Sequence, residues 1–354
     1  MKAVIAHKPS KIETLEVVER ADPGEPGQHQ IRVRLHANSL NYHDYAVANG
    51  AIPTAEGRIL MSDAAGVVEA VGPDVTEFAV GDHVVSLFFP YWQDGTPPHG
   101  NFSHVPGDGL DGYSREVVVT PANWFTPAPK GWSHAEAATL PCAALTAWRA
   151  LVVEGEIKAG DSVLILGTGG VAVFALQFAK MMGATAIITS SSDAKLEKAK
   201  SLGADHTINY KTETRWGDAV QQWTGGRGVD HVLEIGGPGT LPQSITAARV
   251  GGHVSLIGIL TGIAGNVPTL MMMAKQIKLQ GIIVGSRSSI GRFRSKSWRM
   301  RSDTKRAPPI SAKFAWRCKR LRGQIVGSQC RDVHDVCVLR TERADLNRVF
   351  EADE

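Results

Sequence analysis

One glycine-rich turn limits the folds open to this chain more than any other feature of its sequence. Residues 166–172 read Leu-Gly-Thr-Gly-Gly-Val-Ala, a G-x-G-x-x-A pattern placed between a short apolar strand and an apolar helix. Gly167 permits a tight turn, Gly169 lets the backbone approach a phosphate, and the small Ala172 lets helix and strand pack closely. We therefore expect a strand-turn-helix unit whose helix N-terminus binds a phosphate group.

This turn stands at the head of a regular series of strands and helices. The expected strands are Ser162–Leu166, Thr185–Thr189, His206–Ile208, Asp230–Ile235, His253–Gly258 and Lys278–Val284, and the expected helices are Val171–Met182 and Asp193–Leu202. Such alternation is typical of parallel βαβ units. Residues 126–286 are therefore predicted to form a Rossmann domain, a doubly wound parallel sheet of the α/β class that binds a dinucleotide. The predicted cofactor contacts at the turn are Gly167, Thr168, Gly169, Gly170 and Val171.

The end of the second strand indicates which dinucleotide is bound. A carboxylate at this position would bind the ribose 2′-hydroxyl of NAD, but the chain has Ser190-Ser191-Ser192, with Lys195 nearby. Small hydroxyls and a cation accept a 2′-phosphate, so NADPH is favoured over NADH. Asp193 is better suited to the positive end of its helix than to a ribose. In the alternative interpretation, Lys195 is an ordinary solvated helix residue.

The first part of the chain, residues 1–125, has a different pattern. Short alternating strands separated by turn residues predict an all-β unit, with strands around Ile31–Leu35, Gly66–Gly72, Gly81–Val85 and Glu116–Val119. Residues 91–112 are rich in Gly, Pro, Asp and His without periodicity, which predicts an exposed loop at or beside a site. A length of 354 residues agrees with two domains.

The sequence up to about Ser286 resembles the medium-chain dehydrogenase/reductase superfamily, in particular its zinc-free quinone oxidoreductase branch. The matching segments are Asn38–Asp44, Asp63–Val68, Val80–Val84, Ala143–Trp148, the glycine turn and Leu202–Asp205. The resemblance implies a GroES-like, β-rich catalytic domain over residues 1–125, followed by the Rossmann domain, with the active site in the cleft between them.

The resemblance also bears on zinc. Zinc-dependent members hold the catalytic metal with two cysteines and a histidine, whereas the matching positions here carry Asn41, Ser62 and Cys142. The four cysteines of a structural zinc lobe are missing as well, because residues 1–141 contain no cysteine. No metal site is therefore expected. Cys142 is interpreted as a small buried residue, and Cys330, His334 and Cys337 lack a recognised zinc spacing.

Six further site residues follow from the resemblance alone. It places Asn41 and Tyr42 beside the nicotinamide and the substrate, and Thr146 against the nicotinamide ring. It also implies that Tyr210 lies near the 2′-phosphate and that Ile257 and Gly258 pass beside the carboxamide. Alternatively, Asn41 only caps the helix that it opens and Tyr42 belongs to the core.

These features together suggest an oxidoreductase that transfers a hydride from NADPH to a quinone or an α,β-unsaturated carbonyl compound without zinc. The alternatives are an alcohol dehydrogenase-like enzyme and a non-catalytic NADPH-binding protein. We expect a homodimer with Ile282–Val284 as an edge strand, a small-molecule substrate, and a cytoplasmic location, since four cysteines indicate no disulfide framework.

The resemblance ends near Ser286, where a basic tail begins. Residues 286–354 contain 17 Lys and Arg against 8 Asp and Glu, and the basic stretch 292–301, interleaved with aromatic residues, shows neither helical nor strand periodicity. The family would supply helices, a strand returning to the catalytic domain and another cofactor contact, none of which we expect here. The abrupt change suggests a shifted reading frame. An arm binding nucleic acid or an anionic membrane is the less favoured alternative.

Overall fold

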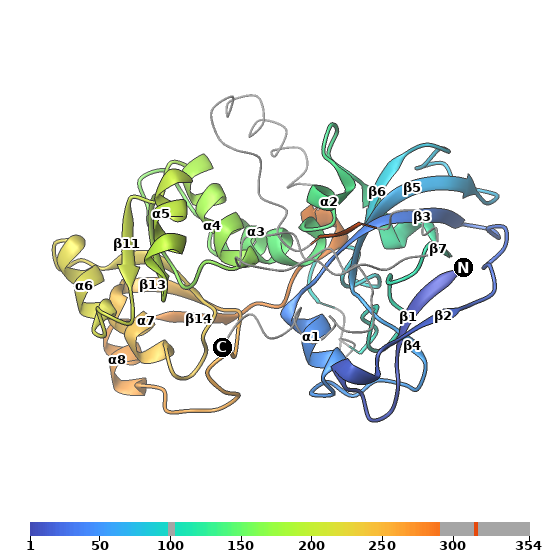
Figure 1. The fold of residues 1–354 in the computed structure, drawn as a ribbon. Coiled ribbons are helices and arrows are strands. Elements are labelled where there is room, and N and C mark those ends of the chain that lie inside the picture. Colours follow the sequence, from blue (N-terminus) through green and yellow to red (C-terminus); the bar gives the residue numbers. More distant parts are fainter. Residues whose placement is uncertain (98–102, 291–314, 318–354) are drawn as a thin grey trace. The chain divides into compact units, whose positions relative to one another are not determined.

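The computed structural model describes residues 1–97, 103–290 and 315–317, and contacts divide the chain into two units (Figure 1). The first unit comprises Met1–Cys142 together with the described residues after Val284, and the second comprises Ala143–Val284. This division falls later in the sequence than the domain boundary expected after residue 125. Strand β8 (Phe125–Pro127) pairs with a strand of the first unit, which accounts for part of the difference. The domain limits stay a prediction.

The second unit is built on one six-stranded sheet in which all the pairings are parallel. Its strands, in the order β11-β10-β9-β12-β13-β14, are β9 (Ser162–Ile165), β10 (Thr185–Ser190), β11 (His206–Asn209), β12 (Val229–Glu234), β13 (Ala248–Leu256) and β14 (Lys278–Gly281). This is the doubly wound order, so the predicted Rossmann fold is confirmed.

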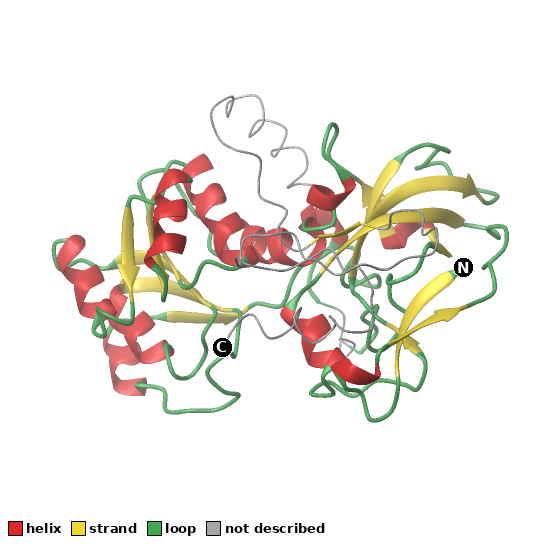
Figure 2. Ribbon diagram, in the orientation of Figure 1, coloured by secondary structure: helices red, strands yellow, loops and turns green. Residues whose placement is uncertain are grey.

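Helices lie on both sides of this sheet (Figure 2). They are α3 (Leu145–Trp148), α4 (Gly170–Met181), α5 (Asp193–Ser201), α6 (Trp216–Trp223), α7 (Leu241–Ala247) and α8 (Thr269–Ala274). Between them, Leu164, Val232 and Val254 of the central strands pack with Trp216 and Ile245 in a buried apolar core. Residues Ile282–Val284 were expected to form an edge strand, but this prediction is wrong because β14 ends at Gly281. The Ile282 amide still donates a hydrogen bond to Leu256 O at 2.9 Å.

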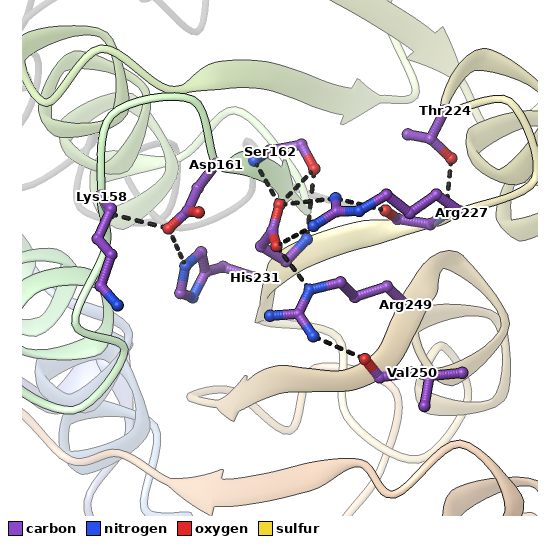
Figure 3. Close-up of polar contacts among 10 residues, drawn as sticks. Lys158, Asp161, Ser162, Thr224, Arg227, His231, Arg249 and Val250 are labelled. Carbon is purple, nitrogen blue, oxygen red and sulfur yellow. Dashed lines mark hydrogen bonds and ion pairs between the residues drawn. The ribbon is translucent and has the colours of Figure 1, made fainter.

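An ion network ties together the amino ends of β9, β12 and β13. The Asp230 side chain is 4% exposed, and its carboxylate accepts hydrogen bonds from Arg227 at 2.7 and 3.0 Å and from Arg249 at 2.6 Å. The amide and hydroxyl of Ser162 donate to the same carboxylate at 2.9 and 3.0 Å. Figure 3 labels Ser162, Arg227 and Arg249 of this network and also shows a second pair, in which His231 Nε2 lies 3.0 Å from Asp161 Oδ2.

The first unit consists of two antiparallel sheets. The smaller has the order β2-β1-β4, and the larger runs β15-β3-β5-β6-β8, with β7 also paired to β3. The strands are β1 (Lys2–Ala6), β2 (Glu16–Glu19), β3 (Gln30–Ser39), β4 (Arg58–Ile59), β5 (Asp63–Val71), β6 (His83–Ser86), β7 (Val117–Pro121), β8 and β15 (Ala315–Arg317). Ile31, Val33, Tyr113 and Phe125 contribute to its buried core, and the short helices are α1 (Tyr42–Ala48) and α2 (His134–Ala137). The predicted β-rich domain is confirmed.

One expectation about the tail is wrong, because β15 returns a strand to the first unit. β7 pairs with Gln30–Arg34 of β3, and β15 pairs with Ala37–Ser39 further along that strand. Backbone hydrogen bonds of this kind need no particular side chains, so the sequence pattern gave no sign of them. The basic stretch 292–301 and Cys318, Cys330 and Cys337 lie outside the described residues. No helix of the described chain combines the length and apolar character needed to cross a bilayer.

Three stacked imidazoles form an unusual feature of the first unit. The ring centroid of His134 on α2 lies 4.5 Å from that of His36 on β3 and 4.7 Å from that of His83 on β6. Burial, reinforced by the charges of the two neighbouring histidines, lowers the pKa of His134 to about 4. The stack therefore favours the neutral form of His134.

We expect this stack to make the protein sensitive to mild acid. Because the pKa of His134 is lower when folded than the ordinary 6.5, the unfolded chain takes up the proton first. The stabilisation is complete above about pH 6.5 and is lost as the pH falls toward about 4. With allowance for solvent screening, the loss at about pH 5 is on the order of 1 kcal/mol. His134→Phe should reduce the difference in melting temperature between about pH 7 and pH 5, measured by circular dichroism. The exposed His206→Gln should leave it unchanged, and an unaltered difference in His134→Phe would contradict the prediction.

Candidate cofactor and active site

The glycine turn of the second unit leaves its backbone open. Gly167 has a φ of +76°, a conformation that favours glycine, and its amide donates a hydrogen bond to Thr189 Oγ1 at 3.2 Å. Gly169 is the N-cap of α4, and a Cβ built at Gly167 or Gly169 would meet no atom within 4 Å. Ala172 is fully buried where α4 meets the sheet. Open space at the N-terminus of a twelve-residue helix is suited to a diphosphate.

The residues expected around the adenine ribose lie together beside this turn. Thr168 Oγ1 and Ser190 Oγ are 3.2 Å apart, and the Tyr210 amide donates to Ser190 O at 3.1 Å. Lys195 stands in the first turn of α5, where its amide lies 3.5 Å from Ser192 Oγ. Ser191 is half-buried between Ser190 and the start of this helix.

Asp193, the acidic residue in the first turn of α5, is already hydrogen-bonded within the protein. Asn209 Nδ2 donates to Asp193 Oδ1 at 2.8 Å, and Asp193 is exposed at the first turn of α5. A carboxylate there interacts favourably with the helix N-terminus and with the amide of Asn209. This arrangement agrees with the interpretation of Asp193 as a helix partner rather than a ribose ligand.

Three predicted cofactor or catalytic residues of this unit remain, of which Ile257 and Gly258 directly follow β13 and Thr146 lies on α3. The amides of Ile257 and Gly258 donate to Glu234 O at 2.8 and 3.2 Å, and a Cβ at Gly258 would lie 2.0 Å from Ile235 O. Only glycine therefore fits at position 258. Thr146 lies buried on α3.

Glu234 is a residue of this edge that the sequence did not single out. Its side chain is fully buried, and it accepts hydrogen bonds from the Gly237 amide at 2.9 Å and from the hydroxyls of Thr240 and Ser244. The available signal was a charged residue in an otherwise apolar strand end, two positions before the Gly236-Gly237 turn. Glu234 fixes the turn that follows β12.

In the first unit, polar side chains gather around the N-terminus of α1. Asn41 is its N-cap and its amide N–H donates to Asp44 Oδ2 at 2.8 Å, while its side-chain Nδ2 lies 3.2 Å from Ser62 Oγ. Asp63 is fully buried, and the Cys142 amide donates to its Oδ2 at 3.1 Å. Asn41 thus both caps the helix and belongs to a polar cluster, so the two interpretations of this residue are compatible.

Tyr42 is not a core residue, so the alternative interpretation of this residue is wrong. Its side chain is 60% exposed in the described structure, and its ring centroid lies 6.0 Å from that of Tyr45. The predicted catalytic residues are divided between the units, with Asn41 and Tyr42 in the first and Thr146 in the second. Their roles toward substrate and cofactor stay predictions.

The donors of this cluster do not fit a catalytic zinc ion. Zinc in such a site needs thiolate, imidazole or carboxylate ligands in tetrahedral geometry. Asn41 and Ser62 offer an amide and a hydroxyl that hydrogen-bond to each other, which leaves Cys142 as the single suitable donor of the three matching positions. Within the described ranges, no group of three or more His, Cys, Asp or Glu side chains could hold a metal.

His43 and Asp108 are members of this region that the sequence did not identify. His43 Nε2 lies 2.9 Å from Asp108 Oδ2, and the His43 ring packs edge-on against Phe88 at 5.2 Å. Burial alone would lower the pKa of His43, but the carboxylates of Asp108 and Asp44 outweigh it and raise that pKa to about 9. Asp108 comes from the loop predicted to lie near a site. Its pairing with a residue 65 positions away could not be read from spacing.

Asp63 has an unusual environment as well. Burial, together with the charge of Asp44, raises the pKa of its carboxyl well above the usual range, despite hydrogen bonding from Asn41 and the Cys142 amide. Its Oδ1 is buried and has no hydrogen-bond partner among the described residues. A neutral carboxylic acid is the form that this environment favours.

Comparison with known proteins gives matches to both parts of the chain. The family described as "Alcohol dehydrogenase GroES-like domain" matches residues 27–130, and the one described as "Zinc-binding dehydrogenase" matches residues 170–298. The "Zinc-type alcohol dehydrogenase-like protein C1773.06c" of Schizosaccharomyces pombe is 44% identical over 285 residues, which cover 78% of this chain and 81% of that protein.

Two further relatives extend the comparison. The "2-haloacrylate reductase" of Burkholderia sp is 34% identical over 269 residues, covering 74% of each chain. The solved structure of a putative alcohol dehydrogenase from Sinorhizobium meliloti 1021 is 43% identical and superposes with a TM-score of 0.79, covering 84% of this chain and 88% of that one. Each of these matches covers more of the chain than either unit alone.

Proposed function

This chain is an NAD(P)H-dependent oxidoreductase of the medium-chain dehydrogenase/reductase superfamily, and from that premise we propose that it uses NADPH to reduce quinones or α,β-unsaturated carbonyl compounds without zinc. The observation that supports the proposal is the open glycine turn at Gly167 and Gly169, where a built Cβ would meet no atom within 4 Å and a diphosphate could approach the backbone. The homodimer and the cytoplasmic location expected from the sequence belong to the same proposal.

The donor set of the first unit supports an acceptor that is already electrophilic. A zinc ion would polarise the oxygen of a simple alcohol or ketone as a Lewis acid, and Asn41 and Ser62 do not form a zinc site with Cys142. A carbonyl conjugated with a carbon–carbon double bond accepts a hydride without a metal. One relative is named a 2-haloacrylate reductase, and 2-haloacrylate is a carboxylate conjugated with a carbon–carbon double bond. That name describes the substrate of the relative, and its chemistry is related to the acceptor proposed here.

The second strand end supports NADPH rather than NADH. Thr168 and Ser190 place two hydroxyls 3.2 Å apart beside the turn, and Asp193 is engaged by Asn209. A 2′-phosphate would meet hydroxyls and the cation of Lys195 instead of a repelling carboxylate. When bound, the cofactor supplies a hydride, and the chain's residues hold it and position the acceptor.

The test measures cofactor binding and turnover with the full-length protein. We expect NADPH oxidation at 340 nm with a panel of quinones and enones, and tighter binding of NADPH than of NADH in fluorescence titrations. Lys195→Ala should weaken NADPH binding about tenfold, equivalent to ~1.4 kcal/mol, because it removes a cation from the 2′-phosphate. Its effect on NADH should stay below about twofold.

Lys198→Ala is the matched control, since Lys198 is an exposed lysine one turn further along α5. It should leave both affinities unchanged. Equal losses for NADPH and NADH in Lys195→Ala would refute the assignment of Lys195. Binding without turnover of any acceptor would favour a non-catalytic NADPH-binding protein, whereas one bound zinc per chain together with alcohol oxidation would favour the alcohol dehydrogenase-like alternative.

A further inference from the structure

The order of strands in the second unit reverses between β9 and β12. Strands β10 and β11 extend the sheet on one side of this pair, and β13 and β14 extend it on the other. Ligands of doubly wound sheets bind outside the carboxyl ends of the strands at such a point. The Gly167 turn follows β9, so we expect the turns that follow β12 and β13 to contact the other half of the dinucleotide.

Residues 235–240 and 257–265, which follow β12 and β13, are tied together and form what we call the double turn. Thr261 provides the links: its amide and its hydroxyl donate to Gly236 O at 2.7 and 2.8 Å, and its Oγ1 accepts a hydrogen bond from the Gly239 amide at 2.8 Å. These bonds join the first turn to the second at both of its ends.

The backbones of the double turn also pack closely. A Cβ built at Gly237 would lie 2.9 Å from Ile259 Cα. One built at Gly265 would lie 2.5 Å from Pro238 Cβ. Because protein interiors are close-packed and resist compression, a displacement of either turn would displace the other as well.

Glu234, the last residue of β12, attaches the double turn to the sheet. Its side chain is fully buried, and its carboxylate accepts hydrogen bonds from the Gly237 amide and from the hydroxyls of Thr240 and Ser244. Its backbone carbonyl accepts two amides of the second turn. One residue is therefore bonded to both turns.

Glu234 differs from Asp230 at the other end of the same strand. Asp230 is paired with two arginines, whereas no cationic side chain among the described residues forms an ion pair with Glu234. A buried carboxylate held only by neutral donors is costly for the fold. Such costs are typical of positions whose geometry serves function.

We propose that Glu234 is a positioning residue for the nicotinamide half of NADPH, which it aligns through the double turn without touching the cofactor. This inference rests on the proposed function and on the predicted contacts of Ile257 and Gly258 with the carboxamide. Because Glu234 is bonded to both turns, it sets the position of their backbone groups. A fixed carboxamide directs one face of the nicotinamide C4 toward the acceptor, so one of its two hydrogens leaves as hydride.

The first test separates the two halves of the cofactor. NADPH and adenosine 2′,5′-bisphosphate, which contains only the adenine half, are titrated into the full-length protein by calorimetry. Glu234→Ala should weaken binding of NADPH about tenfold and that of the bisphosphate less than about twofold, because only NADPH reaches the double turn. Glu234→Gln can bond the same side-chain partners and should bind NADPH within about threefold of the wild type.

Two controls separate positioning from stability. Asp230→Ala weakens the opposite end of β12 and should lower the melting temperature while leaving the ratio of the two affinities unchanged. Thr261 is exposed, so Thr261→Val removes the hydroxyl bonds of the double turn from an intact fold and should weaken NADPH binding about threefold. Thr269→Val, at an exposed threonine of α8, should change neither affinity.

The second test follows which hydrogen of C4 is transferred. The full-length protein reduces an enone with NADPH deuterated on one face or the other, and mass spectrometry of the product shows the face used. The wild type and Glu234→Gln should transfer the hydride from one face, and Glu234→Ala from both. A role confined to stability would lower the rate without mixing the faces, so transfer from a single face by Glu234→Ala would contradict the proposal.

The outcomes of the binding test separate the two proposals. Equal weakening of NADPH and the bisphosphate in Glu234→Ala, or the same change of their ratio in Asp230→Ala, would overturn the positioning role and leave the reductase intact. If Glu234→Ala does not fold, an unchanged NADPH affinity in Thr261→Val would overturn that role. Failure of the wild type to bind NADPH would overturn the proposed function itself, and the positioning role with it.

Discussion

Gly169→Ala is expected to bind NADPH about 30-fold more weakly than the wild type, a loss of ~2 kcal/mol. Position 169 has a φ of −75°, which alanine adopts without strain, and its Cβ would meet no protein atom within 4 Å. The fold should therefore tolerate the methyl group, while the diphosphate would lose its close approach to the backbone. Isothermal titration calorimetry measures the affinity, and thermal unfolding without cofactor should show an unchanged melting temperature.

Two other glycines provide the controls. Gly281→Ala adds a methyl group to the same sheet, also with no atom within 4 Å, and should alter neither affinity nor stability. Gly167→Ala adds one at a φ of +76° and should lose about 1 kcal/mol of stability in addition to affinity. An undiminished NADPH affinity in Gly169→Ala would show that the diphosphate does not lie on this turn.

The largest stability effect is expected for Asp230→Ala. Removing the carboxylate leaves Arg227 and Arg249 without their shared partner and Ser162 without its acceptor at the half-buried amino end of β9. We expect the free energy of unfolding to fall by about 3 kcal/mol. This is at the low end of the loss usually caused by breaking a buried ion pair, because both arginine side chains are partly exposed. Urea denaturation measures this change.

The effect should depend on pH with a defined sign. Burial opposes ionisation of Asp230, but hydrogen bonds from Arg227, Arg249 and Ser162 outweigh it and hold its pKa well below the usual range. The stabilisation is therefore present above about pH 4 and is lost as the pH falls below it, so the deficit of Asp230→Ala should shrink in acid. Asp218→Ala removes an exposed pair with Arg215 and should change stability by less than about 0.5 kcal/mol. An equal deficit in both variants would contradict this account.

The parallel sheet could be predicted because its signals are local. β9 and β10 are short apolar runs with turn residues at their ends, and the glycine turn identifies β9 and α4 within a few residues. The helices α6 and α7 were not assigned, since the first is short and the second contains a proline in its first turn. A short helix with a proline gives little periodicity to read.

The polar cluster of the first unit could be predicted only in part. Asn41 was found through the family resemblance, but the contact of His43 with Asp108 and that of Asp63 with Cys142 join residues 65 and 79 positions apart. Such contacts depend on tertiary folding, which spacing within one segment does not encode. The substrate roles of Tyr42 and Thr146 stay predictions for the same reason, as they depend on residues of both units.

The strands of the second unit carry different properties at their opposite ends. Ser162, at the start of β9, is bound to the Asp230 network, and the same strand leads into Gly167 five residues later. A strand of that length spans about 15 Å, which exceeds the distance of ~8 Å over which exposed charges interact at physiological salt. Charges can therefore be exchanged at the amino edge to alter heat resistance while the electrostatic field felt by the cofactor phosphates stays nearly constant, so the two traits can evolve separately.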